Sequence, residues 1–190
     1  MLDQPTLRTD RLVLRPFVLT DAPAVQALAS VRELADTTLN IPHPYPAGAA
    51  EEWIATHGAA SATGAAAAFA VTERVRDHAG PVVGAISLVV DRRHDSAELG
   101  YWIGVPFWGR GYCTEGARAV VGYGFEVLGL HRIHAMHFTR NAASGRVMQK
   151  LGMRFEGCRR EHVRKWDGFE DVALYGILGS DWRADAARRV

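Results

Sequence analysis

The 190-residue sequence contains only two cysteines, Cys113 and Cys158, and no CxxC pair. Two thiols cannot form a disulfide framework, which excludes a small disulfide-stabilised secreted domain. The first residues, MLDQPTLRTDRL, lack the apolar core of a signal peptide, and no apolar run reaches the ~18 residues needed to span a bilayer. We therefore expect a cytoplasmic protein without a membrane partner.

The sequence also lacks an excess of charge of either sign. It has 22 basic and 21 acidic residues, which gives a formal net charge of +1. Proteins that bind nucleic acid usually carry a basic excess or a basic stripe, so we expect no nucleic-acid partner. The hydrophobic content of 48% and the charged content of 23% are those of a globular protein that can bury a sizeable core.

Metal-binding motifs are missing, although the sequence has eight histidines. There is no HExxH motif. His131, His134 and His137 recur every three residues, which would align them on a helix, but the segment RIHAMHF alternates with a period of two and predicts a strand. On a strand, His134 and His137 face opposite sides. We therefore expect no metal.

What is present is a mixed pattern of strands and helices without repeats or linkers, which predicts one α+β domain. The pair Asp167-Gly168 predicts a hairpin between the last two strands. The stretch 58–68, rich in alanine and glycine, fits either a longer second helix or a loop. The predicted strands cover about 11–17, 69–74, 82–90, 96–103, 132–138, 155–163 and 170–177, and the predicted helices about 21–29, 51–57, 114–128 and 141–151.

One junction has very little side chain. The stretch GVPFWGRGYCTEG, residues 104–116, lies between the strand predicted at 96–103 and the helix predicted at 114–128. Glycine lets the backbone approach a ligand, and a helix that begins there directs unpaired N–H groups and a partial positive charge at an anion. The stretch therefore predicts a phosphate site, with a glycine-rich turn that binds nothing as the alternative. It matches neither the P-loop nor the dinucleotide-binding fingerprint.

The segments that follow agree with this interpretation. The stretch from Glu98 to Gly157 closely resembles the GNAT superfamily of acetyl-CoA-dependent N-acetyltransferases, and within it the RimJ/RimL type, which acetylates N-termini of ribosomal proteins and, in relatives, other amines. The segments TDRLVLRPF, PYPAGAAEEWI and WDGFEDVALYGILGSDW also sit where that type has them. The resemblance covers nearly the whole chain.

The resemblance implies a GNAT fold. Its central, mostly antiparallel twisted sheet would have about seven strands flanked by about four helices, and would splay between the fourth and fifth strands. Acetyl-CoA, the co-substrate, would lie in that splay. The domain would fill residues 1–190, with a core at about 8–178 and a C-terminal tail at 179–190.

The resemblance also assigns the glycine-rich loop to the co-substrate. In the family, a six-residue loop of pattern Q/R-x-x-G-x-G/A holds the pyrophosphate of coenzyme A on backbone amides, and residues 108–113 read WGRGYC here. Trp108 departs from the polar first position and Cys113 from the small last position. The amides assigned to the pyrophosphate are those of Arg110, Gly111, Tyr112, Cys113 and Thr114.

Two further segments are implied to contact the co-substrate. Backbone N–H groups near Tyr101, Trp102 and Ile103 would stabilise the oxyanion that develops during transfer. Asn141 would bond the pantetheine or thioester region by analogy, and its alternative role is that of a helix N-cap, which asparagine favours.

Acetyl transfer to an amine requires a neutral amine, a polarised carbonyl and a proton for the departing thiolate. The predicted base is Glu98, because relatives commonly carry a glutamate on this strand; its alternative is a surface carboxylate. Ser144, also counted among the co-substrate contacts, is the predicted acid, with stabilisation of the first helical turn as its alternative. Many relatives use a tyrosine four positions later, where this chain has Met148.

The implied reaction is direct attack of an amine on acetyl-CoA in a ternary complex. The acceptor implied by type is the N-terminal α-amine of a protein, with a small-molecule amine such as an antibiotic, polyamine or amino acid as the alternative. A non-catalytic acyl-CoA-binding module is the second alternative. Tyr45 and Trp53 are the predicted acceptor contacts, and His43 and Trp166 fit either acceptor contact or core packing. Members of this type often form homodimers, although the sequence does not determine the oligomeric state.

Overall fold

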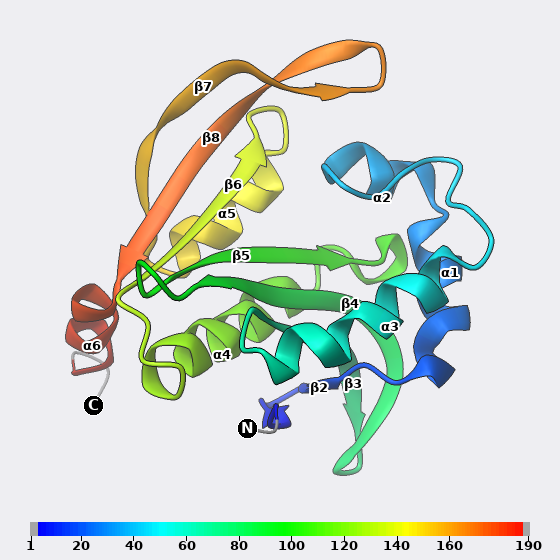
Figure 1. The fold of residues 1–190 in the computed structure, drawn as a ribbon, viewed down its shortest axis with the longest axis horizontal. Coiled ribbons are helices and arrows are strands. Elements are labelled where there is room, and N and C mark those ends of the chain that lie inside the picture. Colours follow the sequence, from blue (N-terminus) through cyan, green and yellow to red (C-terminus); the bar gives the residue numbers. More distant parts are fainter. Residues whose placement is uncertain (1–3, 188–190) are drawn as a thin grey trace.

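A single sheet organises the described part of the chain, residues 4–187 of a computed structural model (Figure 1). Residues 1–3 and 188–190, which the predicted single domain includes, lie outside the described residues. The elements are β1 (Leu7–Arg8), β2 (Leu12–Pro16), η1 (Leu19–Asp21), α1 (Ala22–Ala29), α2 (Arg32–Thr37), α3 (Ala49–Ala62), β3 (Ala66–Val75), β4 (His78–Asp91), β5 (Ser96–Ile103), η2 (Val105–Phe107), α4 (Tyr112–Glu126), β6 (Arg132–Phe138), α5 (Ala142–Lys150), β7 (Arg154–Lys165), β8 (Gly168–Leu178) and α6 (Gly179–Ala187).

The eight strands follow the order β1-β2-β3-β4-β5-β6-β8-β7. Every pair is antiparallel except β5 and β6, which run parallel. The β5–β6 pairing covers only Ser96–Glu98 against Arg132–His134, and beyond it the two strands diverge (Figure 1). Strands β5 and β6 correspond to the fourth and fifth predicted strands, so the splay predicted between those two strands is confirmed.

Alternation along the strands gives the sheet two apolar faces. On one face α4 packs on side chains that are fully buried, among them Leu12, Leu14, Phe69, Ile86 and Leu88. This is the larger core, and it stabilises the fold because each such side chain contributes about 1.5–3 kcal/mol when removed from water.

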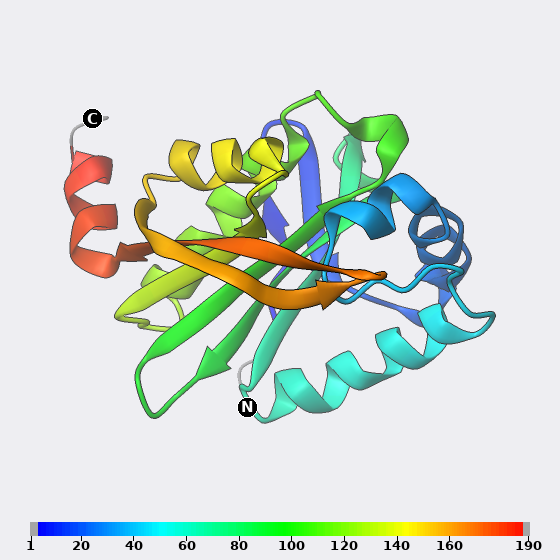
Figure 2. The same ribbon diagram turned by 90° about the horizontal axis from the view of Figure 1, so that it is seen from above.

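Helices α1 and α3 cover the opposite face, so that the sheet lies between α3 and α5 (Figure 2). Val25 of α1 and Ile54 of α3 pack there on Ala70 and Val82. Trp102 projects into this cluster from β5. The alanine- and glycine-rich stretch 58–68 resolves only in part as helix, because α3 continues through Ala62 and β3 already begins at Ala66.

The structure adds five elements to those that the sequence predicts: the two-residue strand β1, the helices α2 and α6, and the short 3-10 helices η1 and η2. Helix α6 occupies most of the segment predicted as a tail. Trp182 anchors it, with its ring centroid 6.0 Å from that of Phe125 and its indole N–H donating to Glu126 Oε1 at 3.2 Å. The last residues of that tail, 188–190, lie outside the described residues.

Two glycines of α4 have different surroundings. A Cβ at Gly124 would lie 2.8 Å from Ile133 Cδ1 and 3.0 Å from Leu88 Cδ1, so this glycine lets the helix contact the sheet closely. A Cβ at Gly122 would meet only ordinary contacts, at 3.5 Å from Trp182 Cζ2. Only Gly124 is therefore required by space.

We expect the substitutions Gly122→Ala and Gly124→Ala to change stability in opposite directions. Alanine favours a helix over glycine by about 1 kcal/mol, so Gly122→Ala should raise the free energy of unfolding by about 0.5–1 kcal/mol. Overpacking of a buried contact costs about 1–3 kcal/mol, so Gly124→Ala should lower it. Denaturant unfolding of both variants measures the difference, and equal shifts would contradict the close contact at Gly124.

Candidate active site

Two cavities meet where β5 and β6 diverge. One, of about 460 Å³, lies on the α1–α3 side and is called the inner cavity here. The other, of about 420 Å³, runs along the glycine-rich loop and α5 and is called the loop cavity. They share the wall residues Thr37, Thr38, Tyr101, Trp102 and Ser144. Groups bound in the two cavities would therefore approach each other at the end of β5.

The glycine-rich loop forms one end of the loop cavity. Gly109 and Gly111 have φ of 75° and 80°, a conformation that glycine adopts without strain. Gly111 is the N-cap of α4, and the first helical bond runs from Glu115 N to Gly111 O. The amides of Tyr112, Cys113 and Thr114 precede that bond and point out of the helix end, as an anion site requires.

Side chains around the loop fix its position. The carboxylate of Glu115 accepts from Thr9 Oγ1 at 2.6 Å and from Arg11 Nε at 2.7 Å, which ties α4 to the start of β2. Tyr112 donates its hydroxyl to Glu73 Oε1 at 2.8 Å. Trp108, in the place of the usual polar residue, donates its indole N–H to Ile103 O at 2.5 Å. The loop is therefore held in place by the protein itself.

The positive charges of the loop cavity come from α5. The guanidinium of Arg110 lies 3.6 Å from Glu73 Oε1 and over the Phe107 ring, away from the cavity wall. Arg146 and Lys150 line the cavity instead. The amide of Arg110 thus remains a candidate anion contact, but its charge is directed elsewhere.

Cys113 adds no negative charge to this end of the cavity. Part of the residue remains exposed, but burial of its thiol raises the pKa of Cys113 to about 12. The thiol is therefore neutral near pH 7, and a small neutral group at the last loop position is compatible with a bound anion.

The free edge of β5 directs alternate backbone groups into the splay. Gly104 donates its N–H to Val83 O at 2.8 Å, so the N–H groups of Ile103 and Tyr101 point away from β4 and into the splay. The N–H of Trp102 points toward β4. The side chain of Trp102, by contrast, lines both cavities.

Tyr101 and Ser144 form a hydroxyl pair at the junction of the cavities. The Tyr101 hydroxyl lies 2.9 Å from Ser144 Oγ and donates to Ser144 O at 3.1 Å. Burial raises the pKa of Tyr101 well above its usual value, so the phenol stays protonated. The sequence suggested only the backbone of Tyr101, yet β5 also brings its hydroxyl beside Ser144, where both residues line the two cavities.

Glu98 lines the inner cavity from the same face of β5 as Trp102. Among the described residues, no cation forms an ion pair with it. Its partner across the parallel pair is His134, whose pKa is lowered mainly by burial. A neutral His134 leaves the Glu98 carboxylate free to interact with a bound cation.

Both polar ends of the Asn141 side chain have partners. Its Oδ1 accepts from Ser144 N at 3.2 Å, so Asn141 caps α5. Its Nδ2 donates to Thr37 O at 3.3 Å. The N-cap role considered from the sequence is confirmed, and the same side chain also links α5 to the last residue of α2.

Of the aromatic residues predicted to contact an acceptor, Tyr45 and Trp53 line the inner cavity. Trp53 lies in an aromatic cluster, with its ring centroid 5.1 Å from that of Phe17 and 6.5 Å from that of Trp102. His43 and Trp166 do not line either cavity; their rings contact each other at 6.4 Å.

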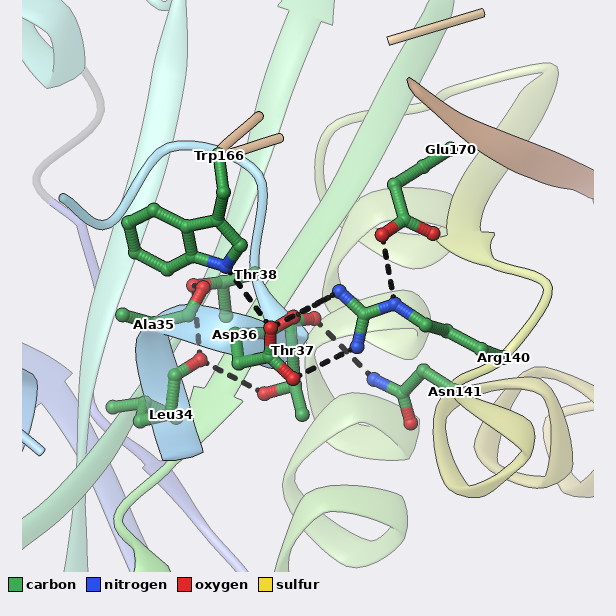
Figure 3. A network of polar contacts seen from close by, with 9 residues as sticks. All are labelled: Leu34, Ala35, Asp36, Thr37, Thr38, Arg140, Asn141, Trp166 and Glu170. Carbon is green, nitrogen blue, oxygen red and sulfur yellow. Dashed lines mark hydrogen bonds and ion pairs between the residues drawn. The ribbon is translucent and has the colours of Figure 1, made fainter. Parts of the chain in front are cut away.

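A covering segment, residues 32–41, closes over both cavities and is tied to the far side of the splay (Figure 3). Arg140 donates to Asp36 Oδ2 at 2.9 Å and to Glu170 Oε1 at 2.9 Å. Trp166 donates its indole N–H to Asp36 Oδ1 at 3.0 Å, and this bond, with Arg140, holds the pKa of Asp36 below its usual value. Lys165, which is buried, donates to Ile41 O at 3.1 Å.

No pattern in the sequence predicted the role of this covering segment. Asp36 and Arg140 are 104 positions apart, and neither belongs to a local motif. Thr37 and Thr38, which line both cavities, were also missed, because the helix that ends at Thr37 is too short to show a period.

Metal and membrane features complete the description. Within residues 4–187, no group of three or more His, Cys, Asp or Glu side chains is placed to hold a metal ion. In the same part of the chain, no helix has the length and apolar character required to cross a membrane.

Comparison with known proteins agrees with this geometry. Residues 11–154 match the acetyltransferase (GNAT) domain family. The chain is 32% identical over 174 residues to the uncharacterized N-acetyltransferase YoaA of Bacillus subtilis (strain 168), an alignment that covers 92% of this chain and 97% of that protein. It is 29% identical over 96 residues, 50% of each chain, to the [ribosomal protein uS5]-alanine N-acetyltransferase of Escherichia coli (strain K12).

Among solved structures, RimL, a ribosomal L7/L12 α-N-protein acetyltransferase in complex with coenzyme A, is similar with a TM-score of 0.83 and 18% identity, covering 92% of this chain and 98% of that one. This likeness concerns the fold. The chain belongs to the GNAT acetyltransferase family. It is an acetyl-CoA-dependent N-acetyltransferase, an acyltransferase whose relatives include ribosomal-protein N-acetyltransferases of the RimJ/RimL type.

Proposed function

We propose that this acetyltransferase transfers the acetyl group to the N-terminal α-amine of a protein, by direct attack in a ternary complex. The observation that carries the proposal is the junction of two cavities, with Glu98 on the inner side and Ser144 between them. A relative that acetylates an alanine of a ribosomal protein supports the protein acceptor.

The loop cavity fits coenzyme A by its chemistry. The backbone amides from Arg110 to Thr114, in the loop and the first turn of α4, would hold the pyrophosphate, and Arg146 and Lys150 supply positive charge along the cavity wall. When bound, acetyl-CoA supplies an acetyl group joined to a sulfur leaving group. The side chain of Asn141, already bonded to Ser144 and Thr37, positions the start of α5 beside it.

Glu98 is proposed as the base. It accepts a proton from the ammonium of the acceptor, directly or through a water, because its carboxylate lines the inner cavity without an ion-pair partner among the described residues. An α-amine, with a pKa of about 7.7–8.0, gives up its proton more readily than a lysine side chain at about 10.4. Tyr45 and Trp53 would contact the body of the acceptor.

Ser144 is proposed as the donor to the departing sulfur, with Tyr101 behind it. The Ser144 hydroxyl donates its proton at the sulfur and regains one from water, while the Tyr101 hydroxyl, 2.9 Å away, stays protonated and can donate a hydrogen bond to Ser144 Oγ. The N–H groups of Tyr101 and Ile103, which point into the splay, would stabilise negative charge on the carbonyl oxygen. Trp102 contributes a side-chain wall to both cavities.

The second candidate acceptor is a small-molecule amine. The covering segment favours it, because the bonds from Arg140 to Asp36 and from Lys165 to Ile41 O hold this segment over the inner cavity. A cytoplasmic location and a homodimer, which members of this type often form, complete the proposal.

The test is an acetylation assay with purified protein and acetyl-CoA, followed by thiol release and by mass spectrometry of the products. Peptides with a free N-terminus should be acetylated on the α-amine. The same peptides blocked at the N-terminus but carrying an internal lysine serve as controls. Transfer to the lysine but not to the α-amine, or to small amines alone, would contradict the protein acceptor.

A further inference from the structure

The inner cavity has mostly apolar walls. Aromatic rings of Tyr45, Trp53, Trp102 and Phe138 line it together with aliphatic side chains such as Met136. Such walls favour an apolar body on the bound molecule, because they give up little water-exposed polar surface when that body enters.

The charge of this cavity is a single carboxylate. Among the described residues that line it, Glu98 is the only Asp or Glu, and no lysine or arginine is present. A second ammonium group in the cavity would therefore lose its water without gaining an anion as partner, which is costly.

A positively charged side chain, that of Lys165, bonds to the backbone of the covering segment. Lys165 is buried, and its ammonium donates to the carbonyl oxygens of Leu39 and Ile41 at 3.4 and 3.1 Å. Both of these residues line the inner cavity. Lys165 interacts with the Asp36 carboxylate of the same segment and supplies no anion to the cavity, so a second cation beneath the covering segment gains no partner there.

The covering segment is also held in a fixed position. Arg140, from the loop between β6 and α5, and Trp166, from the turn between β7 and β8, both bind the Asp36 carboxylate (Figure 3). Asn141 adds a bond to Thr37 O. The covering segment therefore cannot move aside to let water reach a second ammonium group in the inner cavity without breaking these bonds.

We propose that the inner cavity selects an acceptor with one ammonium group on an apolar body, and rejects diamines, polyamines and amines with a second charge close to the first. This inference rests on the proposed function, in which the inner cavity receives the acceptor. The same chemistry has two sources: the N-terminal residue of a protein with an apolar side chain, and a free alkylamine or arylalkylamine.

The first experiment compares molecules that differ in one charge. Butylamine and 1,4-diaminobutane share a four-carbon chain, which is too short to carry the second ammonium far from the first. We expect kcat/KM to be at least about ten-fold higher for butylamine, because the second ammonium is desolvated without a partner. Pentapeptides that begin with Leu, Asp or Lys and are otherwise identical form the second arm, with the same preference expected for Leu.

The second experiment adds to the inner cavity a carboxylate that can pair with a second ammonium group. Met136 lies two residues beyond His134, the strand partner of Glu98, and on the same face of β6. Met136→Glu places a second carboxylate in the inner cavity and should raise kcat/KM for 1,4-diaminobutane relative to butylamine by about ten-fold. Val127→Glu, at the exposed end of α4, is the matched control and should leave the ratio unchanged.

The outcomes distinguish the proposed selectivity for one ammonium group from the proposed function itself. Preference for butylamine together with Leu peptides supports a protein N-terminus as the source, and preference for butylamine with no peptide turnover supports a free amine. Equal or faster turnover of 1,4-diaminobutane by the unchanged enzyme overturns the selectivity while the acetyltransferase assignment stands. Absence of turnover with every amine, although coenzyme A binds, overturns the proposed function and the inference with it.

Discussion

Replacing Glu98 by glutamine is expected to lower kcat by about 10²–10⁴-fold, the range that general bases contribute. Glutamine keeps the size of the side chain and loses the ability to accept a proton from the acceptor. Because Glu98 lines the inner cavity and not the loop cavity, the Kd for coenzyme A should stay within about two-fold of the original value. Steady-state kinetics with a peptide acceptor, together with calorimetric titration of coenzyme A, measure both quantities.

Glu52→Gln provides the matched control for this experiment. Glu52 lies exposed on α3, one residue before Trp53, and lines neither cavity. Its replacement makes the same chemical change on the same side of the sheet and should leave kcat unaltered. If Glu98→Gln retained full activity, Glu98 would be removed from the mechanism and the base would have to be water or the acceptor itself.

Replacing Gly111 by valine is expected to weaken coenzyme A binding by about 10–100-fold. Gly111 has φ of 80°, which a β-branched residue adopts only at a cost of roughly 1–2 kcal/mol. Relief of that strain rotates the backbone at the N-cap of α4 and redirects the amides that follow it. Calorimetric titration of coenzyme A reads the change in Kd directly.

Gly129→Val separates this effect from a general loss of stability. Gly129 has φ of 68° and open space around its Cβ position, so valine is strained there as well. It follows the end of α4 and lines neither cavity. The two variants should lose comparable unfolding free energy, and only Gly111→Val should lose coenzyme A. Equal Kd values for both variants would show that the loop amides do not form the diphosphate site.

The sequence predicted those elements whose signal is local. The alternation in β5 and β6, the apolar spacing of α4 and the Asn141 cap of α5 all depend on neighbouring residues, and all are found in the structure. The mostly antiparallel sheet and its splay came from the family resemblance, and the order of the strands came only from the structure, because pairing between distant strands leaves no mark in a short window of sequence.

What the sequence could not show depends on distant contacts. The Tyr101 hydroxyl reaches Ser144 across 43 positions, and Arg140 reaches Asp36 across 104. The direction of the Arg110 side chain is likewise set by Glu73, on another strand. Residue types at these positions are unremarkable in isolation, so their roles emerge only when the fold brings them together.

The short pairing between β5 and β6 has a wider consequence. Beyond its three paired residues, the edge of β5 that faces β6 keeps backbone N–H and C=O groups without strand partners. Water must bond to these groups when no ligand does. A ligand lying along that edge could bond to these backbone groups as a ninth strand would, and so extend the hydrogen-bond ladder of the sheet. Since such a ligand binds only the folded chain, its concentration would tune the melting temperature of the enzyme as well as its rate.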